Sequence, residues 1–322
     1  MDYFDFKGTP TGTITVSPPG GTGGHHKGGH HGAPGPLPTD DFPSPIPKLL
    51  HATKAGHTTL WVVFAIFTIG LIGLWPMALR VEKRARFFHG VSAGVLTIAM
   101  VSYLAMATGL GTTFVPIHNH AADASVYKYF REVYFARYID WLFTTPLLLL
   151  SLAVLAGLSP ADTVLVICAD VFMIVTGLLG GLVPARWATG ERSRWTWFTV
   201  SCIGFLVIWY VLITGGLRAS KHRPSKTRGL FVLLSIMTFI LWAAYPVVFA
   251  LTEGANMVSV NTEVIAYAVL DVSAKVGFTY MLLLVHTHGE DDTWTLPEWF
   301  VTHRHGHGSD GRGGYGAIGN DD

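Results

Sequence analysis

The chain has 322 residues, of which 50% are hydrophobic and 13% are charged, and its formal net charge is +1. Soluble domains carry about 25% charged residues, so this composition and the long apolar runs indicate a membrane protein. The near-neutral charge, with no basic patch interleaved with aromatic residues, argues against a nucleic-acid partner.

Residues 1–50 are rich in glycine, proline and histidine, and no apolar run follows Met1. We therefore expect a disordered extracellular tail rather than a cleaved signal peptide, because too little apolar surface is present to offset the ordering entropy. The pairs His25-His26 and His30-His31 could bind a metal weakly, but a flexible polar tail is the simpler interpretation, and we assign no metal site. Residues 291–322 predict a second polar tail, in the cytoplasm.

Residues 51–290 contain seven apolar runs long enough to cross the membrane as helices. The runs are continuously apolar, whereas the strands of a membrane barrel alternate between apolar and polar residues. We therefore predict an all-α membrane protein, a seven-transmembrane-helix bundle. The predicted spans are 57–79, 88–110, 132–156, 161–182, 195–216, 228–251 and 262–287.

Lysine and arginine residues in the loops predict the orientation of the bundle. The loops after the first and fifth spans hold nine of them, and the loops on the opposite side hold five. The positive-inside rule then places the N-terminus outside and the C-terminus in the cytoplasm. The five on the outer side are Lys128, Arg131, Arg186, Arg192 and Arg194.

Several ionisable residues lie within the predicted spans. A charge at the bilayer centre costs about 2.5–3.5 kcal/mol on insertion scales, so each one marks a candidate functional site. These residues are Arg137 and Asp140 in the third span, Asp170 in the fourth, and Asp271 and Lys275 in the seventh.

Lys275 is the most informative of these residues. Asp271 lies four residues earlier, so the two side chains share one helix face. The pair could be a structural ion pair, although desolvation makes a salt bridge a poor way to stabilise an apolar interior. A lysine amine in an apolar pocket also suits imine formation with an aldehyde. The spacing alone leaves both interpretations open.

Aromatic and polar side chains recur near these charges. Asp140, Trp141 and Thr144 lie within about one turn and could line a pocket for a cation. Trp242 and Tyr245 share a face of the sixth span beside Pro246, which should kink that helix. Each aromatic residue taken singly also fits simple core packing.

Three segments together, at 137–150, 242–248 and 270–278, resemble the microbial (type 1) rhodopsin family. They read RYIDWLFTTPLLLL, WAAYPVV and LDVSAKVGF, and the likeness to bacteriorhodopsin-like proteins, in the style of fungal members, extends over residues 57–287. The resemblance implies all-trans retinal bound covalently to Lys275 as a Schiff base. Asp140 and Asp271 would be the counterions, and Asp140 also the primary proton acceptor.

The resemblance also implies a set of residues around the retinal. Asp170 would lie near the ring end of the pocket. The expected pocket residues are Tyr138, Trp141, Thr145, Leu148, Met173, Gly177, Phe205, Trp242, Tyr245, Phe249 and Ala274.

Arg137, Glu253 and Glu263 match the proton-release region of the family, with Thr144 near Asp140 and with Tyr103 and Tyr134 nearby. Two carboxylates near an arginine could share a proton and release it. The alternative for the two glutamates is that they are ordinary solvated loop charges.

Ser151 departs from the family pattern of proton pumps, which usually carry Asp or Glu at this position. It lies eleven residues after Asp140, or about 16 Å along a helix toward the cytoplasm. Serine does not titrate near neutral pH, so the usual internal proton donor is missing. Reprotonation would then come slowly from water, or from another group that the sequence does not identify.

These residues support two main hypotheses and disfavour two others. The first is a light-driven outward proton pump, favoured by Asp140, Thr144 and Asp271. The second is a photosensor with a slow photocycle and an unknown partner protein, favoured by Ser151. A carboxylate at Asp140 disfavours a chloride pump, and the chain shows no internal repeat of the kind found in secondary transporters. We expect no enzyme activity, a location in the plasma membrane, and a homo-oligomer.

Overall fold

The structure is a computed structural model that describes residues 47–81, 86–117, 129–184 and 188–287. Within these ranges the elements follow one another in a simple order. They are β1 (Lys48–Leu50), α1 (Lys54–Leu79), α2 (Phe87–Ala107), β2 (Thr113–Ile117), β3 (Tyr129–Val133), α3 (Phe135–Ala156), α4 (Pro160–Leu182), α5 (Ala188–Val211), η2 (Leu212–Gly216), α6 (Leu217–Ser220), α7 (Ser225–Phe249), η3 (Ala250–Gly254), α8 (Val260–Asp271), η4 (Val272–Gly277) and α9 (Phe278–Thr287).

The helices combine into 7 segments long and apolar enough to cross a membrane. The first four spans are α1 to α4. The π-helical turns η2 and η4 interrupt the fifth and seventh spans, and η3 ends the sixth. The expected seven-helix bundle is therefore confirmed, and the chain is an integral membrane protein.

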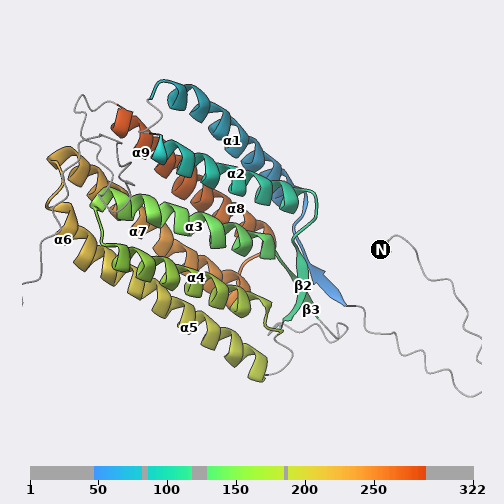
Figure 1. Ribbon diagram of the computed structural model, residues 1–322. Helices are drawn as coiled ribbons and strands as arrows, with labels where there is room; N and C mark the ends of the chain where they lie inside the picture. Colours follow the sequence, from blue (N-terminus) through green and yellow to red (C-terminus); the bar gives the residue numbers. More distant parts are fainter. Residues whose placement is uncertain (1–46, 82–85, 118–128, 185–187, 288–322) are drawn as a thin grey trace, which may run out of the picture. The chain divides into compact units, whose positions relative to one another are not determined.

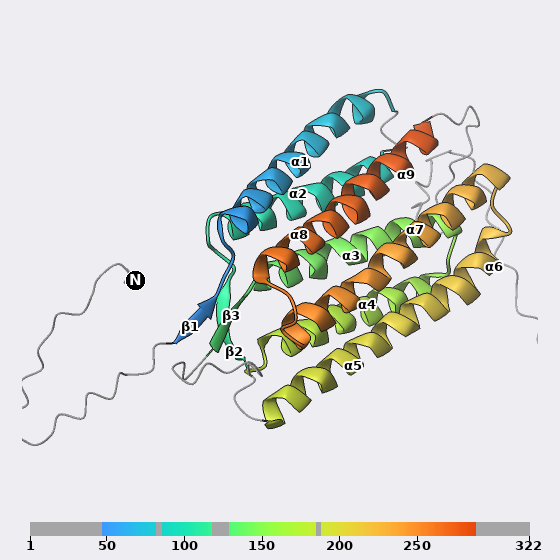
Figure 2. The same cartoon turned by 180° about the vertical axis from the view of Figure 1, so that it is seen from behind.

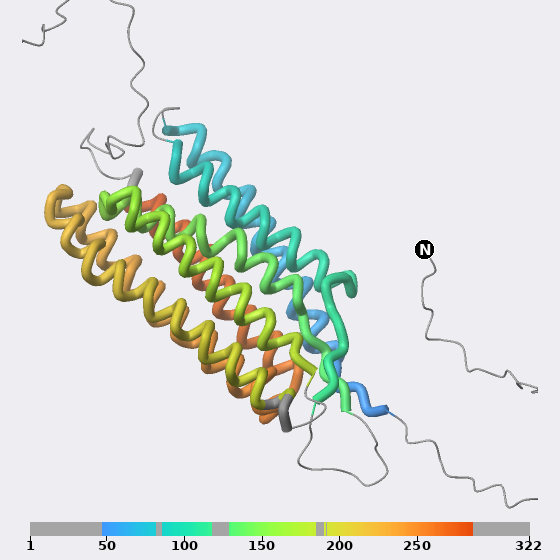
Figure 3. Tube along the Cα trace, turned by 60° about the horizontal axis from the view of Figure 1, so that its bottom comes forward, coloured from blue at the N-terminus to red at the C-terminus, as the bar shows by residue number. Residues whose placement is uncertain are grey.

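The spans pack side by side, with α3 between α2 and α4 (Figure 1). Seen from behind, α8 and α9 lie between α1 and α7, which closes the ring (Figure 2). The same packing can be followed along the Cα trace (Figure 3). In the apolar central part of α3, 67% of the residues are buried, a larger share than in any other described span. The side chains of α3 are therefore the best placed to form a site inside the bundle.

The outward faces of the spans are apolar. Ile69, Trp75, Leu206 and Ile240 each expose more than half of their surface. Large exposed patches of this kind would be a liability in water but are suited to lipid.

Two predicted spans extend beyond the observed helices. The second helix stops at Ala107 rather than at residue 110, because Gly109 and Gly111 adopt positive φ angles of 82° and 71°. Glycine enters this left-handed region at no steric cost, which ends the helix. The third helix begins at Phe135 rather than at residue 132, because the preceding residues form β3.

A small sheet with the order β1-β3-β2 caps the end of the bundle where α1 begins (Figure 2). The central strand β3 pairs in parallel with β1 and antiparallel with β2. We did not predict this sheet. The expectation of disorder up to residue 50 is wrong for Lys48–Leu50, which form β1, because β3 provides hydrogen-bonding partners there. Residues 1–46 and 291–322, including the histidine pairs, lie outside the described residues.

Candidate functional site: a buried lysine between two aspartates

Lys275 lies in the π-helical turn η4, directly after the end of α8 at Asp271. The side chain is buried, with 1% of the residue exposed. Its Nζ donates hydrogen bonds of 2.7 Å to Asp140 Oδ2 and 2.7 Å to Asp271 Oδ1. The structure therefore brings together the lysine and both of the carboxylates that the sequence singled out.

Asp271 is held by several donors besides the lysine. Its Oδ1 accepts hydrogen bonds from Trp141 Nε1 at 3.0 Å and from Tyr245 OH at 2.9 Å. Its Oδ2 accepts one from Tyr103 OH at 2.7 Å. Hydrogen bonds to a carboxylate stabilise its ionised form, so this environment holds Asp271 as a permanent negative charge.

Asp140 has a simpler environment. Its Oδ1 is buried and has no hydrogen-bond partner among the described residues. The hydroxyl of Thr144 donates to the backbone carbonyl of Asp140 at 2.8 Å. Asp140 therefore keeps an oxygen open for a proton, directly beside Lys275.

An aromatic cavity leads away from Lys275, and all of the expected pocket residues line it. Trp141 on α3 and Trp242 on α7 are both part of its wall, as are Tyr245 and Pro246. Six further residues line the cavity and were not expected there from the sequence, namely Ile174, Phe198, Ser201, Cys202, Pro246 and Tyr267. The helical spacing of 198, 201, 202 and 205 on α5 was the signal that could have found three of them.

Asp170 lies near this cavity and is fully buried. Its Oδ2 accepts a hydrogen bond of 2.7 Å from Thr145, which itself lines the cavity. The other oxygen, Oδ1, has no partner among the described residues. Asp170 therefore contacts the wall of the cavity through Thr145.

Ser151 is buried among the leucines of the core, with 2% exposure. Its hydroxyl donates to the carbonyl of Leu147, one turn earlier in α3, at 3.1 Å. This hydrogen bond lies within its own helix, so the position offers neither a titratable group nor a link to another span.

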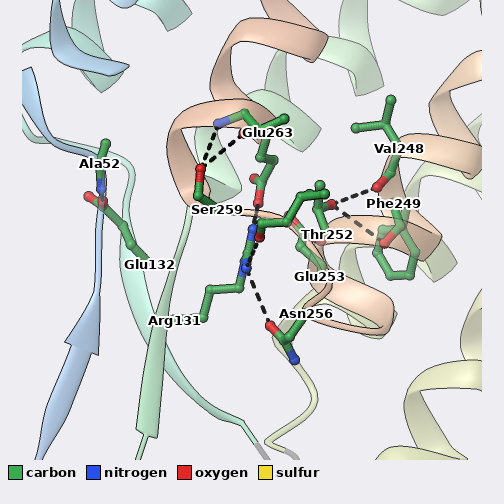
Figure 4. A network of polar contacts seen from close by, with 12 residues as sticks. Ala52, Arg131, Glu132, Val248, Phe249, Thr252, Glu253, Asn256, Ser259 and Glu263 are labelled. Carbon is green, nitrogen blue, oxygen red and sulfur yellow. Dashed lines mark hydrogen bonds and ion pairs between the residues drawn. The ribbon is translucent and has the colours of Figure 1, made fainter. Parts of the chain in front are cut away.

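Glu253 and Glu263 are buried, with 1% and 0% exposure, which excludes the reading of solvated loop charges. Glu263 Oε1 accepts from Arg137 Nη1 at 3.0 Å. Glu263 Oε2 accepts from Arg131 Nη2 at 2.8 Å, as Figure 4 shows. Glu253 Oε2 accepts from Tyr138 OH at 2.5 Å. We call these five residues the outer cluster.

Arg131 and Arg194 were counted as loop charges and are instead buried, with 1% and 2% exposure. Each is buried because it is paired internally. Arg131 binds Glu263, and Arg194 donates to the backbone carbonyls of Glu253 at 2.7 Å and Val183 at 2.8 Å. The signal that we missed for Arg131 is the alternation along β3, where Tyr129, Arg131 and Val133 share one face.

Two aromatic rings flank Arg137. Its guanidinium carbon lies 4.3 Å from the ring centroid of Tyr267 and 5.4 Å from that of Tyr134. Burial, together with the nearby charge of Glu132, raises the pKa of the Tyr134 phenol, so this ring remains neutral. The two rings and Glu263 therefore fix the arginine side chain between them.

These features define a class of protein, namely a seven-span membrane protein with a buried lysine and two carboxylates at the end of an aromatic cavity. A family model described as "Bacteriorhodopsin-like protein" matches residues 54–289. The chain therefore belongs to the bacteriorhodopsin-like family, as its motifs predicted. Membership of this family implies a retinal chromophore.

The relatives include fungal proteins. The chain is 37% identical over 290 residues to Opsin-1 of Neurospora crassa, covering 87% of this chain and 90% of the relative. It is similar to the solved light-driven proton pump LR (Mac) of Leptosphaeria maculans, with 36% identity and a TM-score of 0.71, covering 75% and 99% of the two chains. A halorhodopsin described as a light-driven chloride pump also matches, with 29% identity and a TM-score of 0.65, covering 73% and 97%.

Proposed function

We propose that this protein is a light-driven outward proton pump that carries all-trans retinal on Lys275. The observation that carries the proposal is the unequal environment of the two aspartates beside Lys275. The carboxylate of Asp271 accepts hydrogen bonds from three side chains besides Lys275, whereas Asp140 has one carboxylate oxygen without a partner in the described part of the chain. One stable charge and one available acceptor are what a single outward proton transfer requires.

The residues of the cavity fit retinal. Trp141, Trp242 and Tyr245 provide flat apolar walls, and Lys275 at the end of the cavity provides the only lysine side chain of its lining. When bound, retinal would supply light absorption and an isomerisation that frees the proton held at Lys275 Nζ. Lys275 would hold the group covalently, and the aromatic residues would exclude water from it.

The arrangement of the side chains supports an outward route for the proton. Asp140 Oδ2, 2.7 Å from Lys275 Nζ, would receive it. Arg137 lies one turn before Asp140 on α3 and binds Glu263 of the outer cluster. Neutralising Asp140 removes a negative charge near Arg137 and so changes the balance of charge on the outer cluster, which would release a proton to the outside.

Ser151 gives the proposed pump a slow return step. Because its hydroxyl bonds only within α3, this position would not pass a proton to Lys275 from the cytoplasmic side. Lys275 would then regain its proton from cytoplasmic water, at a rate limited by access through the packed core.

The proposed orientation puts the N-terminus outside, in the plasma membrane. Two of the five outer lysine and arginine residues, Arg131 and Arg194, are buried and internally paired. Without these two, nine lysine and arginine residues remain in the loops of the proposed cytoplasmic side and three in those of the opposite side. This larger difference strengthens the argument from the positive-inside rule. We further propose that the protein forms a homo-oligomer in the bilayer.

A photosensor is the second candidate, and Ser151 is the observation that favours it. Without a carboxylate at that position the photocycle would be slow, and a long-lived state could signal to a partner protein. A chloride pump is disfavoured, because Asp140 places a negative charge where an anion would have to bind Lys275.

The two candidates are separated by transport in yeast cells that express the chain with added all-trans retinal. The pH of an unbuffered suspension is recorded under green light, with and without a protonophore. Acidification that the protonophore abolishes supports the pump. A coloured, photocycling protein without a pH change would favour the sensor.

A further inference from the structure

Glu253 and Glu263 lie in the same outer cluster, but their carboxylates meet different partners. Both oxygens of Glu263 are bound by guanidinium groups, since Arg137 contacts Oε1 and Arg131 contacts Oε2. The contact with Arg131 can be followed in Figure 4. Arg131 makes two contacts to Oε2, from Nη2 at 2.8 Å and from Nε at 3.3 Å. Charge-assisted hydrogen bonds from two cations stabilise the ionised form, so Glu263 is a carboxylate.

Glu253 has no comparable partner. Its carboxyl group makes one hydrogen bond, from Tyr138 OH to Oε2, and its buried Oε1 has no partner in the described ranges. Arg194 reaches the backbone carbonyl of Glu253 and not its carboxyl group. A buried carboxylate without an ion pair is costly, so Glu253 is the member of the pair that carries a proton.

Arg131 is anchored independently of the helix that carries Arg137. It lies on β3, the central strand of the sheet, and its Nη1 also donates to Val258 O at 3.0 Å and to Asn256 Oδ1 at 3.4 Å. These contacts fix Arg131 to the loop before α8. Glu263 therefore keeps one bound cation whatever the position of Arg137.

We propose that Glu253 alone stores the proton released to the outside, and that Arg131 is the positioning residue that keeps Glu263 ionised. This inference rests on the proposed pump function. Release breaks the O–H bond of Glu253, passes the proton to external water and leaves a carboxylate. Glu253 regains a proton when the O–H bond of Asp140 breaks later in the cycle.

The charged and titratable groups that face this pair come from every neighbouring element. Arg137 and Tyr138 come from α3, Arg131 from β3, Arg194 from α5, and Tyr267 from α8, and Tyr134 precedes α3. Of these groups only the arginines are cationic. Two of the three arginines contact the carboxylate of Glu263, and among the described residues none forms an ion pair with Glu253.

The test uses light-minus-dark infrared difference spectra of the full chain with all-trans retinal in liposomes. We expect a carboxylic acid band that is lost as the proton is released. In Glu253→Asp this band should shift in frequency, because aspartic and glutamic acids absorb differently, and in Glu263→Asp it should stay. A shift in both variants, a shift only in Glu263→Asp, or no such band in the wild type would overturn the proposal.

The role of Arg131 is tested with Arg131→Gln and Arg131→Lys, and Arg192→Gln, which removes an exposed arginine of α5, is the control. In Arg131→Gln the proton should divide between the two glutamates, which lowers the Glu253 band at least about twofold and broadens the pH profile of release. Arg131→Lys should restore both, because it keeps the charge, and the control should match the wild type. An unchanged band and profile in Arg131→Gln would overturn the positioning role.

Samples are compared only where the visible absorption shows an intact retinal site, so that unfolding cannot imitate the effect. Proton transport is measured on the same liposomes. If the wild type transports no protons, the proposed function fails. If it transports protons while the band follows Glu263, only the present inference fails.

Discussion

Asp140 and Asp271 each place an oxygen 2.7 Å from Lys275 Nζ, yet only Asp271 is surrounded by further donors. Trp141, Tyr103 and Tyr245 donate to Asp271, and none of them donates to Asp140. Distance to the lysine therefore does not distinguish the two carboxylates, whereas their other partners do. The difference gives each residue its own expected phenotype.

Lys275→Ala should abolish the visible absorption band, because no other amine lines the cavity. The measurement is an absorption spectrum of the purified protein after addition of all-trans retinal. Lys221→Ala, which removes an exposed lysine at the end of α6, is the control and should keep the band. A visible band in Lys275→Ala would remove the assignment of the retinal attachment site.

Asp140→Asn should shift the absorption to the red and stop proton transport. The red shift follows from the loss of a negative charge beside Lys275, and the loss of transport follows from the loss of the acceptor, at least about 100-fold in initial rate. Absorption and pH measurements on the same liposomes check both effects. Asp162→Asn, in the first turn of α4, should change neither. Persistent pumping in Asp140→Asn would show that another group accepts the proton.

Ser151→Asp should accelerate the recovery of the visible absorption after a flash, by about tenfold or more, because it supplies a proton donor on the cytoplasmic side. Flash spectroscopy measures the recovery. Ser151→Ala should recover like the wild type, since it removes only a hydrogen bond within α3. Equal recovery in all three proteins would mean that reprotonation does not pass this position.

Tyr103→Phe should destabilise the protein by about 1.5–3 kcal/mol, because it removes a hydrogen bond to the charged carboxylate of Asp271. The free energy of unfolding follows from thermal or denaturant unfolding monitored by circular dichroism. The matched variant Tyr280→Phe loses a hydrogen bond to the neutral carbonyl of Gly70 and should cost only about 0.5–1.5 kcal/mol. Equal losses would contradict an ionised Asp271.

The spans and the inner site could be predicted from the sequence for a physical reason. A helix that crosses the lipid needs about 20 apolar residues, so each span can be recognised in the sequence as a continuous apolar run. A charged residue within such a run is rare and therefore easy to identify. Asp140, Asp271 and Lys275 were identified in this way, and the structure brings them together. Family resemblance then supplied the residues of the aromatic cavity.

The outer cluster was harder to predict, because its signals are short and its contacts are long-range. Strand β3 has five residues, and Arg131 meets Glu263 from 132 positions away in the sequence. In the sequence, a short strand next to a membrane span cannot be told apart from a loop. An arginine in a loop is then counted as one of the charges that set the orientation in the membrane. Only the pairing of β3 with its neighbours shows that Arg131 faces inward.

The sheet also sets a limit on how far the chain can be shortened. Strand β1 pairs with the strand that carries Arg131, and the amide of Ala52 donates to Glu132 on that same strand at 2.8 Å. A truncation that removes residues up to 47 leaves these contacts intact. A truncation that extends through Leu50 removes β1 and turns β3 into an edge strand. The position of Arg131 on β3, and with it the ion pair to Glu263, would then be less firmly fixed. Residues 48–50, far in sequence from Glu253, thus help to position the strand that carries Arg131.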